Sequence, residues 1–196
     1  MDMPPAVIDV EASGFGRGSY PIEVGFVLPD GDSYCSLIRP AQHWTHWDSA
    51  AEQLHHITQH ALHEHGKSPV AVAAALNQGL RGHVVYSDGW SHDYSWLGLL
   101  FDEAGVSPAF RLDNVRKLFD EREVALWHPT RDAAFVEVIG ARHRASIDAL
   151  AIQTTVMRIK CPELCTPQGI RRAAISEAHC AALLTRDATY GALPFG

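Results

Sequence analysis

Two acidic residues lie close together in an apolar, β-branched stretch near the start of the chain. Asp9 and Glu11 belong to the segment VIDVEAS, residues 7–13, in which their neighbours Ile8 and Val10 are apolar. Side chains two positions apart on a strand point to the same face, so both carboxylates should face one side. Two like charges this close raise at least one pKa unless a cation lies near them. Hard oxygen ligands of this kind suit Mg2+ or Mn2+, and the simpler alternative is a solvated pair on a half-exposed edge strand.

A further acid, Asp93, falls in the first turn of a helix that we expect from about residue 91 to 105, directly after a short apolar strand at residues 83–88. A negative charge is stabilised at a helix N-terminus, so Asp93 could simply support the start of this helix. Asp88, at the end of the strand, competes with Asp93 for any ligand role at this point of the chain.

A third candidate pair is His143 and Asp148, which lie in the segment RHRASIDALA. We expect a helix over residues 145–160, and the apolar neighbours of Asp148 place it near the apolar side of that helix. Taken alone, the two residues could equally be a surface histidine and an ordinary helix acid.

Together, the D-x-E pair, the mid-chain Asp and the H-x4-D pair resemble the DEDD exonuclease superfamily. In order and spacing they are similar to its histidine-containing DEDDh branch, which includes polymerase proofreading subunits and ribonuclease T. PIEVG at 21–25 and LHHIT at 54–58 also resemble segments of that family, and the likeness covers about residues 5–158. Two positions depart from the pattern, because Ser13 stands where Thr is usual and His92 replaces the aromatic residue before the middle Asp.

The resemblance implies an α/β, ribonuclease H-like fold and a two-metal-ion 3'-5' exonuclease that releases nucleoside 5'-monophosphates from DNA or RNA 3' ends. It implies two Mg2+ or Mn2+ ions held by four carboxylates, those of Asp9, Glu11, Asp93 and Asp148. It also implies that His143 acts as general base on the attacking water, since an unperturbed histidine titrates near neutrality. The expected partner is a single-stranded nucleic acid with a 3' end. Dimerisation is common in the family, so a homodimer is compatible with the resemblance.

The expected substrate-binding residues directly follow the first strand and are Ser13, Gly14 and Phe15. A glycine lets the backbone approach a terminal nucleotide closely, and an aromatic ring can stack on a base. For Phe15, packing in the core is an equally simple role. Arg142 and Arg144 flank the histidine and could meet phosphates or be ordinary surface residues.

Histidines crowd one region of the chain, at His43, His46, His55, His56, His60, His63 and His65. His56 and His60 are four positions apart, so they would share one face of a continuous helix and could bind a metal ion there. A solvated helical face is the simpler alternative.

Hydrophobic patterning predicts the elements that would position these residues. Strands are expected at residues 6–12, 21–28, 33–39 and 83–88, and helices within 48–81 and at 91–105, 129–140 and 145–160. A short strand edge and a further helix are expected within residues 111–121. Turn signals between the first three strands predict an antiparallel three-strand meander. A meander, a further strand and then mostly helices predict a mixed sheet flanked by helices.

The composition bounds these hypotheses. The chain has 196 residues, 46% of them hydrophobic, and a net charge of -7. A negative balance argues against coating nucleic acid through bulk electrostatics, though not against contact through bound metal ions. There is no apolar run of about 18 residues, as a membrane helix needs, and the start of the chain lacks the pattern of a signal peptide. We therefore expect no membrane partner and a cytoplasmic location.

Prolines and a glycine at residues 161–169 predict a boundary between an exonuclease domain at 5–160 and a C-terminal extension at 161–196, helical and then irregular. This extension is the segment that could mediate a homodimer. Two other functions stay open: a non-catalytic nucleic-acid-binding or scaffold protein with the same fold, and a phosphodiesterase that acts on short oligonucleotides. The choice between DNA and RNA depends on recognition of the 2'-hydroxyl, which no residue here specifies.

Overall fold

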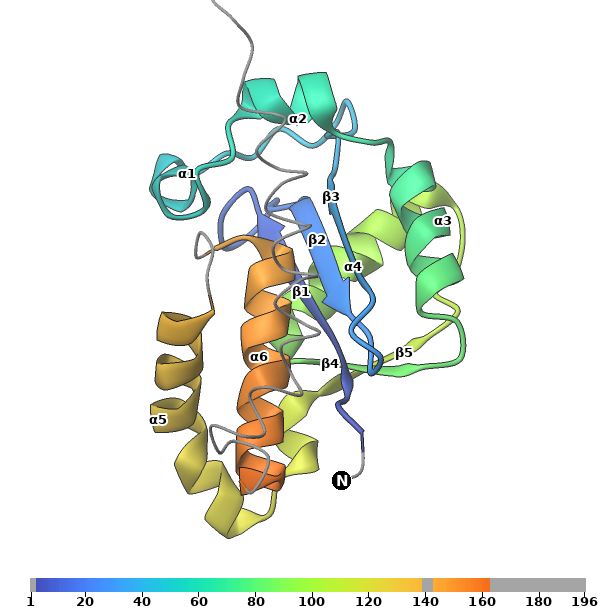
Figure 1. Ribbon diagram of the computed structural model, residues 1–196. Helices are drawn as coiled ribbons and strands as arrows, with labels where there is room; N and C mark the ends of the chain where they lie inside the picture. The colour runs from blue at the N-terminus through green and yellow to red at the C-terminus, as the bar shows by residue number, and fades with distance from the viewer. Residues whose placement is uncertain (1–2, 139–142, 163–196) are drawn as a thin grey trace, which may run out of the picture.

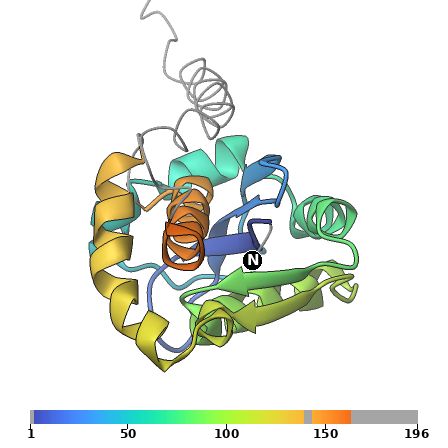
Figure 2. The same cartoon turned by 60° about the horizontal axis from the view of Figure 1, so that its bottom comes forward.

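A computed structural model describes residues 3–138 and 143–162. They form an α/β fold, in which a mixed sheet carries helices on both faces (Figures 1 and 2). Within these residues the sheet has five strands in the order β3-β2-β1-β4-β5. Their bounds are β1 (Ala6–Ala12), β2 (Pro21–Val27), β3 (Ser33–Leu37), β4 (Val84–Ser87) and β5 (Arg111–Asn114). The first three strands pair as an antiparallel meander, and β4 and β5 join them in parallel. The predicted fold class is therefore confirmed.

The described helices follow the strands in chain order. They are α1 (Ser49–His55), α2 (Gln59–His65), α3 (Pro69–Gly79), α4 (Trp90–Ala104), the 3-10 helix η1 (Val115–Leu118), α5 (Glu121–Glu137) and α6 (Ala145–Lys160). The bounds of α4 and α6 agree with the sequence-based expectation to within one residue. Gly105 ends α4 in a left-handed conformation, as glycine commonly does after a helix.

The two faces of the sheet carry different helices. α3 and α4 lie over one face and α5 and α6 over the other, as Figures 1 and 2 show together. The side chains of β1 alternate between these layers: Ile8 and Val10 are buried with α3 and α4, whereas Val7 packs with α5 and α6. Asp9 and Glu11 share the face of Val7, so the strand presents its carboxylates toward α6, as the alternation predicted.

The first turn of α6 lies directly against β2. A Cβ atom on Gly25 would lie 2.6 Å from the carbonyl carbon of Ala145, so the position has no room for a side chain. Gly25 is also the partner of Asp9 in the register between β1 and β2. The close approach at Gly25 therefore brings the N-terminus of α6 to the level of Asp9.

One helix differs from its prediction. The helix expected to begin at Pro129 begins earlier, at Glu121, after a capping box formed by Asp120 and Glu123. Pro129 lies inside the helix, where it removes one backbone hydrogen bond. Trp127 on the same helix is buried in the core shared with α6. This tertiary packing, together with the cap, outweighs the local preference against proline.

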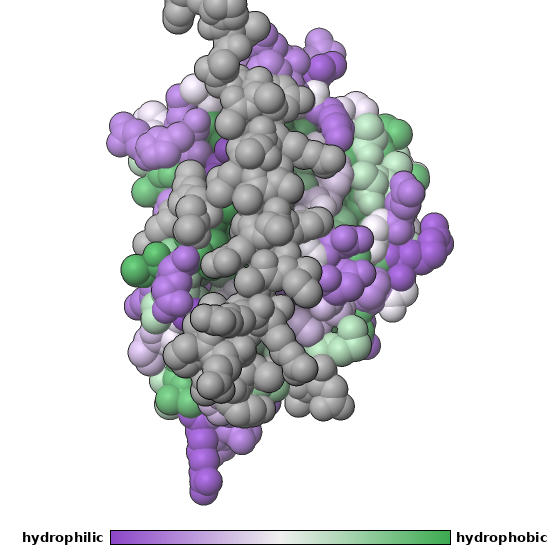
Figure 3. All heavy atoms as spheres, viewed as in Figure 1, coloured by the Kyte–Doolittle hydropathy of each residue, from purple (hydrophilic) through white to green (hydrophobic). Residues whose placement is uncertain are grey.

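The histidine-rich segment does not form one continuous helix. α1 ends at His55, and His56 caps it in a left-handed conformation with φ of 56° before α2 begins at Gln59. His56 and His60 therefore lie on different elements, and the prediction that they share a helical face is wrong. Hydrophilic side chains gather over α1 and α2 at the top of the face in Figure 3, which agrees with the solvated alternative.

Among the described residues, no helix combines the length and the apolar character needed to cross a membrane. α6 ends at Lys160, and the domain boundary expected at residues 161–169 stays a prediction. The C-terminal extension lies outside the described residues from position 163 onward, so its form and any role in a homodimer stay predictions.

Replacing Gly25 with Ala should destabilise the protein, because the added methyl group meets the backbone of α6. Overpacking of this kind lowers the free energy of unfolding by about 1–3 kcal/mol. Chemical denaturation followed by circular dichroism measures the change. Gly98→Ala in α4 is the matched control, since a Cβ atom there meets nothing within 4 Å. Equal stability of Gly25→Ala and the wild type would contradict the close contact between α6 and β2.

Candidate active site

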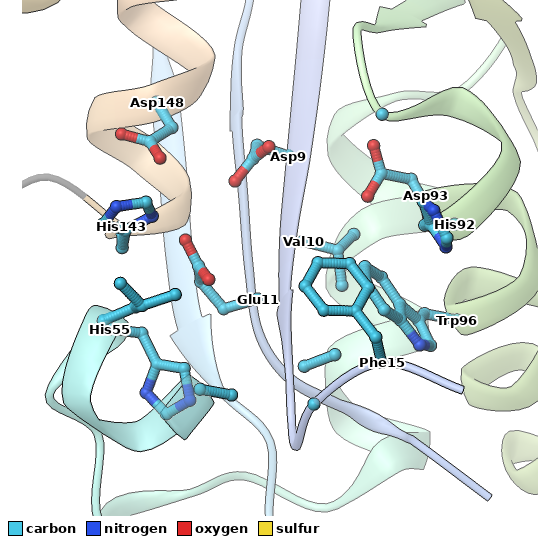
Figure 4. A pocket seen from close by; sticks show the side chains of 15 residues that line it. Asp9, Val10, Glu11, Phe15, His55, His92, Asp93, Trp96, His143 and Asp148 are labelled. Carbon is cyan, nitrogen blue, oxygen red and sulfur yellow. The ribbon is translucent and has the colours of Figure 1, made fainter. Parts of the chain in front are cut away.

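The three acidic motifs of the sequence meet at one cavity beside β1 (Figure 4). The cavity has a volume of about 290 Å3 and is walled by β1, the loop after it, α1, the start of α4 and the start of α6. The residues named from the sequence that line it are Asp9, Glu11, Gly14, Phe15, His92, Asp93, His143 and Asp148. Residues far apart in the chain therefore converge on one site.

Glu11, His143 and Asp148 form a tight group. One potential ligand atom from each lies within 4.8 Å of the other two. Asp148 is buried, whereas Glu11 and His143 are half-buried. No other group of three His, Cys, Asp or Glu side chains of this kind occurs within residues 3–138 and 143–162. This group is a candidate metal site formed between β1 and α6.

Asp9 lies at the centre of the acidic residues, with Asp148 on one side and Asp93 on the other (Figure 4). Asp93 is 3% exposed and lies in the first turn of α4. It does not cap this helix, because the N-cap is Gly89 and no side chain caps the first turn. Its carboxylate instead accepts a hydrogen bond from the Ser87 hydroxyl at the end of β4. The capping role considered for Asp93 is therefore not the one observed.

Asp88 differs from Asp93 in its contacts. Its carboxylate oxygen lies 3.2 Å from a guanidinium nitrogen of Arg131 on α5, and it is not among the residues that line the cavity. Burial raises the pKa of Asp88, and the charge of Arg131 opposes that rise. Of the two candidates, the geometry favours Asp93.

Burial and mutual repulsion raise the pKa values of the clustered acids. Burial raises the pKa of Asp9 well above its ordinary range, and the charges of Asp93, Glu11 and Asp148 add to the rise. Burial, followed by the charge of Asp148, raises the pKa of Glu11 to about 8. Burial raises the pKa of Asp93 to about 7, although the Ser87 hydrogen bond lowers it. Each ionised form therefore needs positive charge nearby.

The donor set of the cavity fits divalent cations. Carboxylate oxygens are the ligands that Mg2+ and Mn2+ prefer in proteins. No Lys or Arg is among the described residues that line the cavity, and the charge of Arg144, from outside it, lowers the pKa of Glu11 without cancelling the rise to about 8. Asp9, Glu11, Asp93 and Asp148 could together hold one or two such ions.

Arg144 does not face the cavity as a phosphate-binding residue. Its guanidinium group pairs with Glu23 on β2, with Nη2 at 2.8 Å from Oε1. The sequence-based expectation that Arg144 meets phosphates therefore finds no support in its contacts. Arg142 lies outside the described residues.

Phe15 stands at the rim of the cavity on an aromatic cluster. It is 64% exposed, so the alternative of core packing is wrong. Its ring meets His92 edge-on, with centroids 5.3 Å apart, and lies 5.9 Å from the ring of Trp96. His92 stacks on the buried Trp96 at 5.5 Å. These three rings form an aromatic wall on the side of the cavity away from His143 (Figure 4).

Ser13 and Gly14 shape the loop that carries Phe15. The Ser13 side chain is fully buried, and its hydroxyl accepts a hydrogen bond from the backbone N–H of Tyr20 and lies 3.1 Å from Nδ1 of His46. Direct substrate contact by this hydroxyl finds no support, because Ser13 is not among the residues that line the cavity. Gly14 has φ of 140° and lines the cavity, and a Cβ atom there would lie 2.6 Å from that of Asp48.

The sequence did not indicate a site role for the residues of α1. Leu54 and His55 line the cavity from this helix, Leu54 at 53% exposed and His55 almost fully buried. Nδ1 of His55 accepts a hydrogen bond from the backbone N–H of Ile57, and burial lowers the pKa of His55. The segment LHHIT was the available signal, although it did not say which of its histidines faces the site.

The fold is similar to those of several solved structures. E. coli exonuclease I in complex with single-stranded DNA, in its zinc-bound form, matches with a TM-score of 0.64 and 14% identity, over 85% of this chain and 43% of that chain. S. pombe Pop2p in its Mg2+- and Mn2+-bound form matches with a TM-score of 0.60 and 13% identity, over 82% of this chain and 85% of that chain. Exonuclease I from Methylocaldum szegediense matches with a TM-score of 0.58 and 12% identity, over 82% of this chain and 41% of that chain.

No family model and no curated protein sequence matches the chain. The chain spans less than half the length of the exonuclease I structures that it resembles. At identities of 12–14%, the structural similarity establishes the fold alone. This is the ribonuclease H-like fold that the resemblance to the DEDD exonucleases implied. Any proposal about the activity of this chain therefore depends on the side chains that line the cavity.

The raised pKa values predict how the metal-free protein responds to pH. Between about pH 4.5 and pH 8 the unfolded chain has released the proton of Glu11, while the folded site retains it. The unfolded state then binds fewer protons than the folded state, so stability should fall as the pH rises through this window. Mn2+ added at pH 8 should raise the thermal midpoint, because it favours the ionised carboxylates.

Calorimetric melting at several pH values checks this expectation. Glu11→Gln should flatten the fall of stability with pH in the metal-free protein, since the variant has no proton to retain at this position. It should also reduce the rise of the thermal midpoint that Mn2+ causes. A wild-type protein whose stability rises relative to Glu11→Gln between pH 5 and pH 8 would contradict the direction of the shift.

Proposed function

We propose that the protein is a metal-dependent exonuclease that removes nucleotides from the 3' end of a single-stranded DNA or RNA. The observation that carries the proposal is the convergence of four carboxylates and one imidazole, from three separate parts of the chain, around one cavity. The similar exonuclease I of E. coli is in complex with single-stranded DNA, which supports the same class of substrate.

Asp9, Glu11, Asp93 and Asp148 would hold two Mg2+ or Mn2+ ions in this proposal. When bound, such a pair activates a water molecule and stabilises charge at the scissile phosphate and on the departing 3' oxygen. Asp9 would be the central residue of this set, because it lies between Asp148 and Asp93 (Figure 4). The raised pKa values mean that protons compete with the ions for these carboxylates at neutral pH and below.

His143 is the residue that we assign as general base. Its imidazole has a nitrogen within 4.8 Å of carboxylate oxygens of Glu11 and Asp148, which stabilise the ring once it carries a proton. It is half-buried, so it reaches the site and can pass the proton on to solvent. The imidazole takes a proton from the attacking water as the oxygen–phosphorus bond forms.

The aromatic wall and α1 would hold the terminal nucleoside. Phe15 is exposed enough for a base to stack on it, and Leu54 offers an apolar surface from α1. With the terminal nucleoside held there, its 5' phosphate lies toward the acids. Attack of water on that phosphorus breaks the bond to the 3' oxygen of the preceding nucleotide, so the product is a nucleoside 5'-monophosphate.

A panel of substrates separates this function from its two alternatives. The protein is given 5'-labelled single strands of DNA and RNA, 3'-blocked strands and dinucleotides, each with Mg2+ or Mn2+. Stepwise shortening of long strands from a free 3' end supports the exonuclease. Cleavage of dinucleotides alone indicates a phosphodiesterase on short oligonucleotides, and binding without cleavage indicates a scaffold protein.

Asp93→Asn should abolish nucleotide release while the protein stays folded, because the change keeps the size of the side chain and removes one charge from the donor set. A loss of at least about 100-fold in kcat is expected, since metal-ion stabilisation is worth several kcal/mol. Asp102→Asn, at an exposed position of the same helix, is the control and should keep wild-type turnover. If Asp88→Asn removes activity and Asp93→Asn does not, Asp88 is the ligand instead.

His143→Gln should lower kcat by about 10²–10⁴-fold, the range expected for loss of a general base. The affinity for Mn2+, measured by calorimetry, should stay within a few-fold of the wild type, because the four carboxylates remain. Unchanged turnover rules out the general-base role. A large loss of Mn2+ affinity would instead identify His143 as a metal ligand.

A further inference from the structure

Glu23 is a buried acid that no step of the proposed reaction uses. It lies on β2, is 0% exposed and is not among the residues that line the cavity. An ionised carboxylate in such a position is costly unless it is paired and hydrogen-bonded. Its contacts show which part of the chain it holds.

The carboxylate of Glu23 contacts the segment that starts α6, and the Cys35 thiol on β3 also hydrogen-bonds to it. Nε of Arg144 lies 3.0 Å from Oε1 and 3.2 Å from Oε2, and Nη2 lies 2.8 Å from Oε1. The backbone N–H of Ala145 donates to Oε2 at 2.9 Å. Arg144 is the N-cap of α6 but its own side chain makes no capping bond, so Glu23 supplies an acceptor from β2.

This group of contacts, which we call the clamp, lies next to two residues of the site. His143 directly precedes Arg144, and Asp148 belongs to the first turn of α6. His143 has φ of 60°, a left-handed conformation that is unfavourable for a residue with a side chain and persists where the surroundings enforce it. The clamp anchors the chain immediately after this strained position.

Stability alone is a weak explanation for the clamp. A buried ion pair can often be replaced by apolar residues with no loss of stability. Two parallel hydrogen bonds fix the orientation of a guanidinium group against a carboxylate. Apolar side chains in the same place would not fix that orientation. The contact of α6 with Gly25 limits how close the helix lies to β2, and the clamp joins β2 to the residues that begin the first turn.

We propose that Glu23 is a positioning residue, which acts through Arg144 and the Ala145 amide to hold His143 and Asp148 against Glu11 on β1. The proposal rests on the proposed function for its catalytic consequence. Its geometric content, the orientation of the segment before α6, does not depend on turnover.

The double variant Glu23→Leu with Arg144→Met separates positioning from stability. It removes one charge of each sign, so the net charge is unchanged, and fills the site with apolar side chains. The thermal midpoint should stay within a few degrees of the wild type. The kcat should fall about 10–100-fold, the usual effect of losing a residue that orients a ligand, while KM changes by less than about threefold because the aromatic wall is untouched.

Two single variants complete the series. Arg144→Lys keeps the charge but loses the planar fork, so it should lower kcat by less than the double variant does. Glu137→Gln breaks the ion pair with Arg158 toward the other end of α6 and is the matched control. It should leave both kcat and the affinity for Mn2+ at wild-type values.

Two measurements test the positioning role of Glu23 without measuring turnover. Calorimetry should show Mn2+ binding about 10-fold weaker in the double variant. The NMR signal of the His143 imidazole, assigned by its loss in His143→Gln, should shift in the double variant and not in Glu137→Gln. If the wild type binds Mn2+ but hydrolyses no 3' end, the proposed function fails, and these two measurements still test the clamp.

Wild-type kcat, Mn2+ affinity and histidine signal in the double variant would together overturn the proposal. A double variant that loses stability but keeps the kcat of its folded fraction would show that Glu23 and Arg144 serve folding only. If the double variant does not fold, Arg144→Lys decides by the same measurements.

Discussion

Repulsion between buried carboxylates around Asp9 is the constraint on which the rest of the structure depends. Burial and neighbouring charge raise the pKa of Asp9, Glu11 and Asp93 alike, so each added ionised group makes the next less favourable. Among the described residues no Lys or Arg lines the cavity, and the charge of Arg144 opposes only part of the rise at Glu11. A cluster of acids with this cost is typical of a functional site rather than of a stabilising one.

The scaffold meets this constraint by bringing rigid elements together at one level of the sheet. β1 is central and separates an apolar face from an acidic face, α4 brings Asp93 from one side, and α6 brings Asp148 from the other. Gly25 allows α6 to approach β2, and Glu23 orients its first turn. The acids and the aromatic wall thus line the same cavity, an arrangement that suits a ligand with a phosphate at one end and a base at the other.

Much of the fold could be predicted because it depends on local patterning. The alternation of Asp9 and Glu11 with apolar residues identified β1 and its two faces, and the segment at 145–160 gave the bounds of α6. Turn signals gave the antiparallel meander. The start of α5 could not be predicted in this way, because packing of Trp127 stabilises a helix through Pro129 against local preference.

The sequence by itself determined which residue types could hold a cation and in what order they occur. Only the tertiary structure placed Asp93 rather than Asp88 beside the cavity, exposed Phe15 at its rim, and paired Arg144 with Glu23. It also brought α1 and His55 into the wall of the site. These outcomes depend on which distant segments pack together, and the charge and burial of a side chain are fixed by those neighbours rather than by its place in the chain.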